Sequence, residues 1–296
     1  MMEKNPDNIV AKLKERIDAI IKERPSHREI LEFLGEVMVE QYKVRPKVKT
    51  DPVKLDKENI KATMEGFPLV AKRDLPLDMA SATSLFKRLC KVLSLRKDAS
   101  GDSKRINEAL RRKDIDLVEL LKQVGAENVE YVSALSRKLG IREDLLLFLA
   151  GNSIRPIWEA YANELKGYVD LERWWRGICP ICGSLPFIAE LREEGERFLV
   201  CSSCNFEWRF GRLKCPFCEN EDHKELRYFY SEKEGKANRV DVCDKCKTYI
   251  KAIDVRELPS DCISFAEDAG TLYLDLLAQA EGYKRRNDVW GVDRTS

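Results

Sequence analysis

The sequence predicts an α+β fold: an all-α N-terminal domain, two tandem rubredoxin-like or zinc-ribbon metal modules, and a C-terminal helix. Two observations predict it. Apolar residues recur at helical spacing through the first half, and short alternating segments replace them after Trp174. Eight of the ten cysteines then fall in four Cys-x-x-Cys pairs. The predicted domains are the helical domain 1–172, the first ribbon 173–212, the second ribbon 213–258, and the helix and tail 259–296.

Helices are expected through the first half of the chain. Residues 8–24 carry apolar side chains on one face, and after the break at Pro25 a second helix runs to about Tyr42. Prolines and charges make 43–58 an extended connector, and 66–77 is irregular. Further helices are predicted at 78–96, 103–112, 115–124, 127–139 and 142–150, and one more opens at Arg155-Pro156.

Strands are expected beside the cysteine pairs in the second half. Their β-branched and aromatic residues alternate with polar ones over four to seven positions. A last helix is predicted from about Phe265 to Tyr283, with three leucines on one face. The predicted strands are 186–191, 197–200, 207–213, 226–230, 239–242 and 248–253.

Charge and hydropathy exclude several classes of protein. The chain has 296 residues, with 52 basic and 51 acidic side chains. This balance argues against a protein that coats nucleic acid or anionic lipid. No signal core or membrane-length apolar run is present, so we expect a cytoplasmic protein without a membrane span. In that compartment, paired cysteines are metal ligands or redox thiols rather than structural disulfides.

The Cys-x-x-Cys pairs carry the strongest signal. Two residues between the cysteines let both sulfur atoms reach one ion, and Gly183 permits the tight turn after the first pair. Glu219 takes the glycine position after the third pair. Four thiolates can enclose one tetrahedral zinc or iron ion. We therefore predict two metal ions, zinc or iron, held by Cys179, Cys182, Cys201, Cys204, Cys215, Cys218, Cys243 and Cys246.

Spacing favours sequential sets of four cysteines. The first set reads C-x2-C-x18-C-x2-C and the second C-x2-C-x24-C-x2-C, with ten residues between them. A cross-braced arrangement, first pair with third and second with fourth, stays open but closes longer loops. Four independent redox dithiols are a further alternative. The flanking strands and turns differ from the helix start that a thioredoxin motif requires.

The chemistry of these sites points away from catalysis. Each has four protein ligands, and a closed site of this kind is structural, because a catalytic zinc keeps one position open. Residues 171–256 hold 16 basic and 15 acidic side chains. Adding eight thiolates and two divalent ions brings the net charge of this region to about −3. A surface that binds nucleic acid needs a positive charge instead. No nucleophile triad, phosphate loop or carboxylate pair is evident, so we predict a protein that is not an enzyme and has no catalytic residue.

Four motifs resemble the formate dehydrogenase accessory protein family, FdhE. Residues 267–275 also resemble the C-terminal segment of that family. Glu267 stands where the family shows aspartate, a difference that keeps the negative charge. The likeness covers about 174–283 and is looser over 60–170. The four motifs are WWRGICPICGSLP at 174–186, RFLVCSSCNFEW at 197–208, RLKCPFC at 212–218 and CDKCKTYIK at 243–251.

The resemblance implies a non-catalytic, cytoplasmic chaperone-like factor for enzyme maturation. Such a protein binds the catalytic subunit of a formate dehydrogenase and carries rubredoxin-like metal sites. Two other functions stay open at this point: an iron-thiolate redox protein that protects or reduces a client, and a nucleic-acid-binding zinc ribbon. The oligomeric state is also open, with a homodimer among the alternatives.

Overall fold

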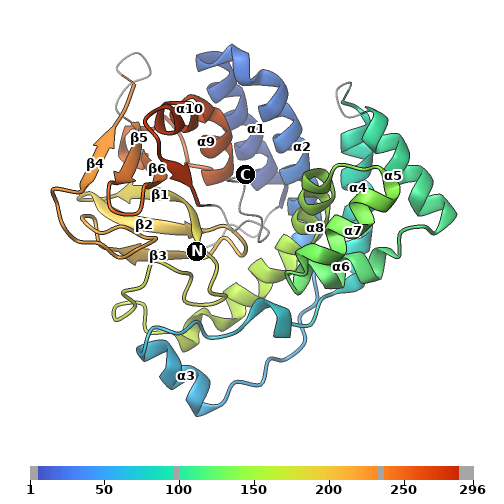
Figure 1. The fold of residues 1–296 in the computed structure, drawn as a ribbon, viewed down its shortest axis with the longest axis horizontal. Coiled ribbons are helices and arrows are strands. Elements are labelled where there is room, and N and C mark those ends of the chain that lie inside the picture. Colours follow the sequence, from blue (N-terminus) through green and yellow to red (C-terminus); the bar gives the residue numbers. More distant parts are fainter. Residues whose placement is uncertain (1–5, 97–99, 232–236, 287–296) are drawn as a thin grey trace. The chain divides into compact units, whose positions relative to one another are not determined.

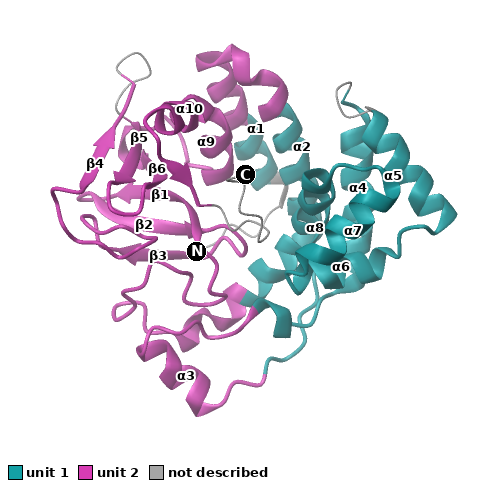
Figure 2. Ribbon diagram, in the orientation of Figure 1, with its two compact units in different colours: residues 1–14, 32–53, 72–161 teal, residues 15–31, 54–71, 162–296 magenta. Residues whose placement is uncertain are grey.

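The computed structural model describes residues 6–96, 100–231 and 237–286, which form the helices and the sheet of Figure 1. The chain divides into two compact units (Figure 2). Unit 1 comprises Met1–Lys14, Glu32–Val53 and Lys72–Tyr161, and unit 2 comprises Glu15–Leu31, Lys54–Ala71 and Ala162–Ser296. The domain boundaries 172, 212 and 258 stay a prediction.

Unit 1 is helical. Three of its helices begin at a side chain that accepts a hydrogen bond from the backbone N–H three residues on: Asp78, Asp116 and Asn128. The buried core residues of this unit include Phe86, Leu120 and Leu149. Its helices are α4 (Met79–Ser94), α5 (Ser100–Arg112), α6 (Leu117–Gly125), α7 (Val129–Leu139) and most of α8 (Glu143–Leu165), with parts of α1 (Pro6–Glu23) and α2 (Arg28–Val44).

Helix α8 continues through Pro156, where we expected two separate helices. Proline has no N–H to donate to the carbonyl group of Asn152, four residues earlier. The Gln41 side chain replaces that donor, because its Nε2 lies 2.8 Å from the Asn152 carbonyl oxygen. The buried carbonyl therefore keeps a partner, and the helix is not interrupted.

Unit 2 is built on one seven-stranded sheet with the order β3-β2-β1-β6-β5-β4, and β7 pairs with β6. All six predicted strands are confirmed, and the short β7 was not predicted. Central β1 and β6 are buried nearly throughout, whereas edge strands β3 and β4 keep exposed residues. The strands are β1 (Pro186–Arg192), β2 (Glu196–Cys201), β3 (Glu207–Phe210), β4 (Leu226–Phe229), β5 (Asn238–Cys243), β6 (Thr248–Asp254) and β7 (Lys284–Arg285).

The sheet is assembled from the repeated four-cysteine unit. Each copy runs cysteine pair, two antiparallel strands, cysteine pair, third strand. The copies join where β1 of the first pairs in parallel with β6 of the second, with Ile188 opposite Lys251. A helical region followed by a sheet region with two four-cysteine groups confirms the predicted α+β class. Both groups also belong to a single sheet.

Two short helices, α9 (Ser264–Gly270) and α10 (Leu272–Ala280), pack on the sheet within unit 2 (Figure 1). They replace the single helix expected over 265–283. Lys251 of β6 is fully buried, and its Nζ lies 2.8 Å from Asp268 and 2.7 Å from Asp275. Arg285 donates to the same two carboxylates, so charge is balanced around the lysine.

The remaining elements are short. Helix α3 (Lys57–Met64) begins at the capping box of Asp56 and Asn59. Only its first two residues fall in the connector predicted at 43–58, and no element was predicted for the rest. None of the described helices combines the length and apolar character that crossing a bilayer requires. Single 3-10 turns occupy Pro25–His27, Arg45–Lys47, Lys72–Asp74, Lys166–Tyr168 and Val255–Glu257.

Candidate metal centres

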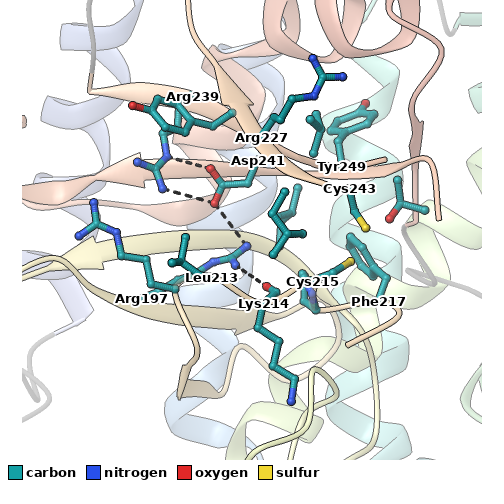
Figure 3. A pocket seen from close by; sticks show the side chains of 17 residues that line it. Arg197, Leu213, Lys214, Cys215, Phe217, Arg227, Arg239, Asp241, Cys243 and Tyr249 are labelled. Carbon is teal, nitrogen blue, oxygen red and sulfur yellow. Dashed lines mark hydrogen bonds and ion pairs between the residues drawn. The ribbon is translucent and has the colours of Figure 1, made fainter. Parts of the chain in front are cut away.

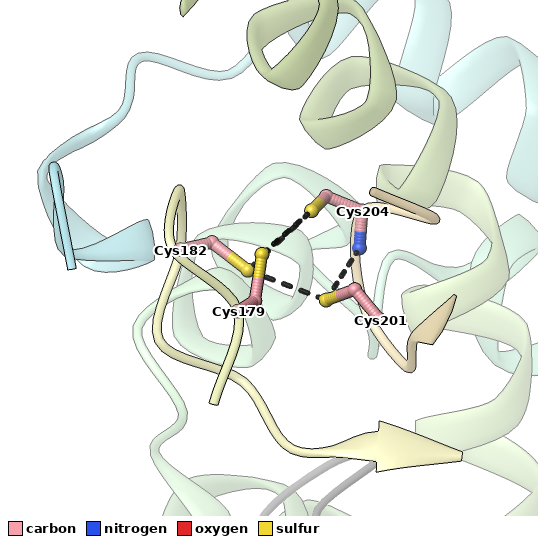
Figure 4. A group of neighbouring side chains, drawn as sticks. All are labelled: Cys179, Cys182, Cys201 and Cys204. Atoms are coloured by element: carbon pink, nitrogen blue, oxygen red, sulfur yellow. Dashed lines mark hydrogen bonds between the residues drawn. The ribbon is translucent and has the colours of Figure 1, made fainter. Parts of the chain in front are cut away.

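The eight predicted ligand cysteines gather in two groups, paired sequentially. The sulfur atoms in each group all lie within 4.8 Å of one another. Figure 4 shows the first group, in which two cysteines from the segment before β1 face Cys201, the last residue of β2, and Cys204 just after it. We call Cys179, Cys182, Cys201 and Cys204 the first centre, and Cys215, Cys218, Cys243 and Cys246 the second centre.

Sulfur spacing fits a tetrahedral ion. A Zn–S distance of about 2.3 Å places neighbouring sulfurs of a tetrahedron about 3.8 Å apart. In the first centre, the Cys179–Cys204 and Cys182–Cys201 sulfur distances are 3.6 and 3.5 Å. In the second, the Cys215–Cys246 and Cys218–Cys243 distances are both 3.7 Å. Each donor set could therefore hold one zinc or iron ion without rearrangement.

A left-handed residue follows every Cys-x-x-Cys pair. Its φ is +76° at Gly183, +55° at Asn205, +58° at Glu219 and +54° at Lys247. Asparagine tolerates this conformation, whereas glutamate and lysine adopt it at a cost of about 1–2 kcal/mol each. At Gly183, Glu219 and Lys247, the backbone N–H donates to the carbonyl oxygen of the first cysteine of the pair, in each case at 2.9 Å. The same turn geometry therefore recurs after all four pairs, with backbone strain at Glu219 and Lys247.

The first centre is enclosed. All four cysteines are buried, and the backbone N–H groups of Ser203 and Cys204 each lie 3.4 Å from the Cys201 sulfur. Burial raises the pKa of the Cys179 and Cys204 thiols well above the usual value. These thiols would therefore stay protonated unless a cation stabilised the thiolates. Metal binding would release those protons.

The second centre is more open. Cys218 and Cys246 are partly exposed, while Cys215 and Cys243 are buried. Burial raises the pKa of Cys215 and Cys218. Burial also acts to raise that of Cys246, but the Thr248 hydroxyl, 2.9 Å from its sulfur, helps to lower the net value. Thiolate formation thus costs less at Cys246 than at Cys215 or Cys218.

Backbone contacts fasten the two centres together. A Cβ on Gly177 would lie 1.8 Å from the Pro216 carbonyl oxygen, so the chain leading to the first centre admits only glycine there. Residues 69 and 70 run beside the first cysteine pair, because Leu69 N–H donates to the Pro180 carbonyl oxygen at 2.9 Å. A segment from the first half of the chain thus braces the first centre within unit 2.

Two cysteines lie outside the centres. Cys90 is buried in α4, as predicted for a core thiol, and burial raises its pKa to about 12. Cys262 precedes α9, and burial and neighbouring Glu190 raise its pKa strongly. Both thiols are therefore protonated at neutral pH and poorly nucleophilic.

Sequence analysis missed one buried cation beside the second centre. Arg197 in β2 is 3% exposed and donates from Nη1 to the Lys214 carbonyl oxygen at 3.0 Å. Lys214 directly precedes Cys215, so Arg197 contacts the backbone of the second centre from the first copy of the repeat. The sequence did contain a signal for it: an arginine within a strand whose other residues are mostly apolar and predicted to be buried.

The helical region and the two four-thiol groups on one sheet define a protein with tandem cysteine-ribbon metal modules. Two family models match the chain: "FdhE, central domain" over residues 178–212 and "FdhE, C-terminal domain" over 213–289. These ranges contain the first and second centres, respectively. Residues 178–289 of the chain belong to the FdhE family, as the motif resemblance predicted.

Known relatives agree with this assignment. A protein FdhE homolog of Aquifex aeolicus is 29% identical over 275 residues, covering 90% of each chain. Homologues in Stutzerimonas stutzeri and Escherichia coli K12 are 37% and 33% identical, but the alignments span only 45% and 42% of those proteins. The crystal structure of the FdhE protein from Pseudomonas aeruginosa covers 99% of this chain and 98% of its own, with a TM-score of 0.68. At 21% identity it establishes the fold alone.

Proposed function

We propose that this protein is a non-catalytic cytoplasmic accessory factor that binds the catalytic subunit of a formate dehydrogenase and supports its maturation to an active enzyme. Membership of the FdhE family is the observation that carries the proposal. The family supports a role as a formate dehydrogenase accessory protein. The physical contribution of the cysteine half would be a rigid surface for another polypeptide.

The proposal assigns the eight cysteines as ligands of two structural metal ions, zinc or iron. Closed four-thiol sites stabilise a fold rather than activate a substrate, which agrees with a binding role. The near-neutral chain, with 52 basic and 51 acidic residues, offers little counterion release, so we expect no nucleic-acid partner. A binding titration with DNA or RNA should therefore give no salt-dependent affinity.

A capture and complementation experiment tests this function. Tagged protein expressed in its own host should co-purify the catalytic subunit of a formate dehydrogenase, and deletion of its gene should leave that dehydrogenase inactive. Restoring the native protein or its Cys90→Ala variant should recover activity, because Cys90 lies outside both centres. Cys179→Ser should not recover it. Full dehydrogenase activity in the deletion strain, or a host with no such enzyme, would refute the role.

A redox role is the second candidate, and the partial exposure of Cys218 and Cys246 favours it. Iron held by four thiolates at an accessible centre could exchange electrons with a client. Protein prepared without oxygen would then show thiolate-to-iron absorption in visible light that changes on oxidation. A colourless protein with two zinc ions would exclude this candidate and leave the binding function in place.

A further inference from the structure

A cavity of about 150 Å³ lies in unit 2 against the second centre (Figure 3). Cys215 and Cys243 line it, together with an ion-pair cluster of Arg197, Asp241 and Arg239. These three charged residues come from β2 and β5, one strand from each copy of the repeat. The cavity wall therefore joins two cysteines of one centre to charges drawn from both copies.

Arg197 and Arg239 are equivalent positions of the repeat. Each arginine stands four residues before the cysteine that ends its strand, Cys201 or Cys243. Both guanidinium groups nevertheless approach one carboxylate. Arg239 donates from Nε to Asp241 at 2.8 Å, while Arg197 Nη2 lies 3.4 Å from the same side chain.

This cluster is short of negative charge. Two arginines and one aspartate carry a net charge of about +1, and the Arg197 side chain is 2% exposed. Its Nε and Nη2 have no hydrogen-bond partner within the described ranges. Buried charge of this kind is costly unless another group balances it.

Thiolates of the second centre can provide that balance. Four thiolates with one divalent ion carry a net charge of about −2, and two of these cysteines line the same cavity. The Arg197 bond to the Lys214 carbonyl oxygen also holds the residue next to Cys215. At the first centre, the sulfur atoms contact the Ser184 hydroxyl and the backbone N–H groups of Ser203 and Cys204.

We infer that Arg197 is a positioning residue for the second metal centre, supplying positive charge to its thiolates and fixing the Cys215 turn from the first copy of the repeat. Partners of this kind, outside the ligands themselves, typically change metal affinity by about 10- to 100-fold. The inference rests on the proposal that the second centre holds an ion. It adds that the second ribbon depends on a residue of the first ribbon to hold its ion.

The test uses the full-length protein loaded with two ¹¹³Cd ions. Cadmium NMR gives one signal for each centre. Thr248→Val, beside Cys246, assigns the second signal because it should shift that signal alone. Affinities come from competition with a chelator. Arg197→Gln should displace the second signal and weaken that centre about 10- to 100-fold, with the first centre changed less than about twofold.

Two further variants separate charge from packing. Arg197→Lys keeps the charge and should retain second-centre affinity within about threefold. Asp241→Asn removes the competing carboxylate and should leave that affinity unchanged or higher, whereas a purely structural cluster predicts a loss. Arg209→Gln, an exposed arginine on β3, should change neither signal.

Several outcomes would overturn the inference. Unchanged second-centre affinity in Arg197→Gln would do so, as would equal weakening of both centres or a loss of affinity in Asp241→Asn. Native protein that takes up fewer than two cadmium ions would instead refute the metal assignment on which the inference rests. The two failures are therefore distinguishable.

Discussion

Cys179→Ser is expected to lose the ion of the first centre and to unfold the surrounding sheet. Structural metal binding and folding are coupled, at about 10 kcal/mol or more in small zinc units. The serine hydroxyl is a poor ligand, and the three remaining buried cysteines would lose the cation that holds their sulfur atoms together. The second centre should weaken as well, because Gly177 packs directly against Pro216. Elemental analysis and thermal unfolding measure both effects.

Cys90→Ala is the matched control for that variant. It also removes one buried cysteine, but from α4, away from either group of four. It should keep the full metal content, with only the stability loss of a small core truncation, about 1–2 kcal/mol. A Cys179→Ser protein that retained both ions and melted like the native protein would contradict the structural role of the first centre.

Arg16→Met is expected to destabilise unit 2 by about 3–5 kcal/mol. Arg16 Nε and Nη2 lie 2.5 and 2.8 Å from the two carboxylate oxygens of Glu267, and their side chains are 3% and 1% exposed. This pair connects α1 to α9 across 251 residues of sequence. Removing the arginine leaves Glu267 charged and buried without its partner. Urea unfolding followed by circular dichroism measures the loss.

The double variant Arg16→Met with Glu267→Leu provides the control. Replacing both members of a buried ion pair by apolar residues is often nearly neutral, so most of the lost stability should return. Arg209→Ala disrupts an exposed pair with Glu196 and should cost less than about 1 kcal/mol. If the Arg16 variant cost no more than this exposed control, the pair would not be holding α1 on unit 2.

Local chemistry was readable from the sequence. The spacing of the cysteines predicted which four would meet, because each set closes through a short hairpin. Alternation of apolar residues predicted all six strands beside the cysteines. Gly183 and Glu219 were recognised as turn positions, although Asn205 and Lys247 take the same left-handed conformation.

Features that depend on distant partners were not readable. Helix α8 continues through Pro156 because Gln41, 111 residues away, bonds to the freed carbonyl of Asn152. The parallel pairing of β1 with β6 merges two ribbons that each look self-contained in sequence. The role of Arg197 could not be predicted, because only the fold places it near Asp241 and in the same cavity wall as Cys215. In each case, the periodicity of apolar residues predicts the helix or strand but not which distant residues pack against it.

A metal count combined with a thiol count tests the central claim most directly. Protein purified without oxygen should carry two zinc or iron ions per chain by native mass spectrometry and elemental analysis. Alkylation of the folded protein should modify no more than two cysteines, Cys90 and Cys262, and alkylation after unfolding with a chelator should modify all ten. A folded, metal-free protein with eight freely reactive thiols would contradict the account.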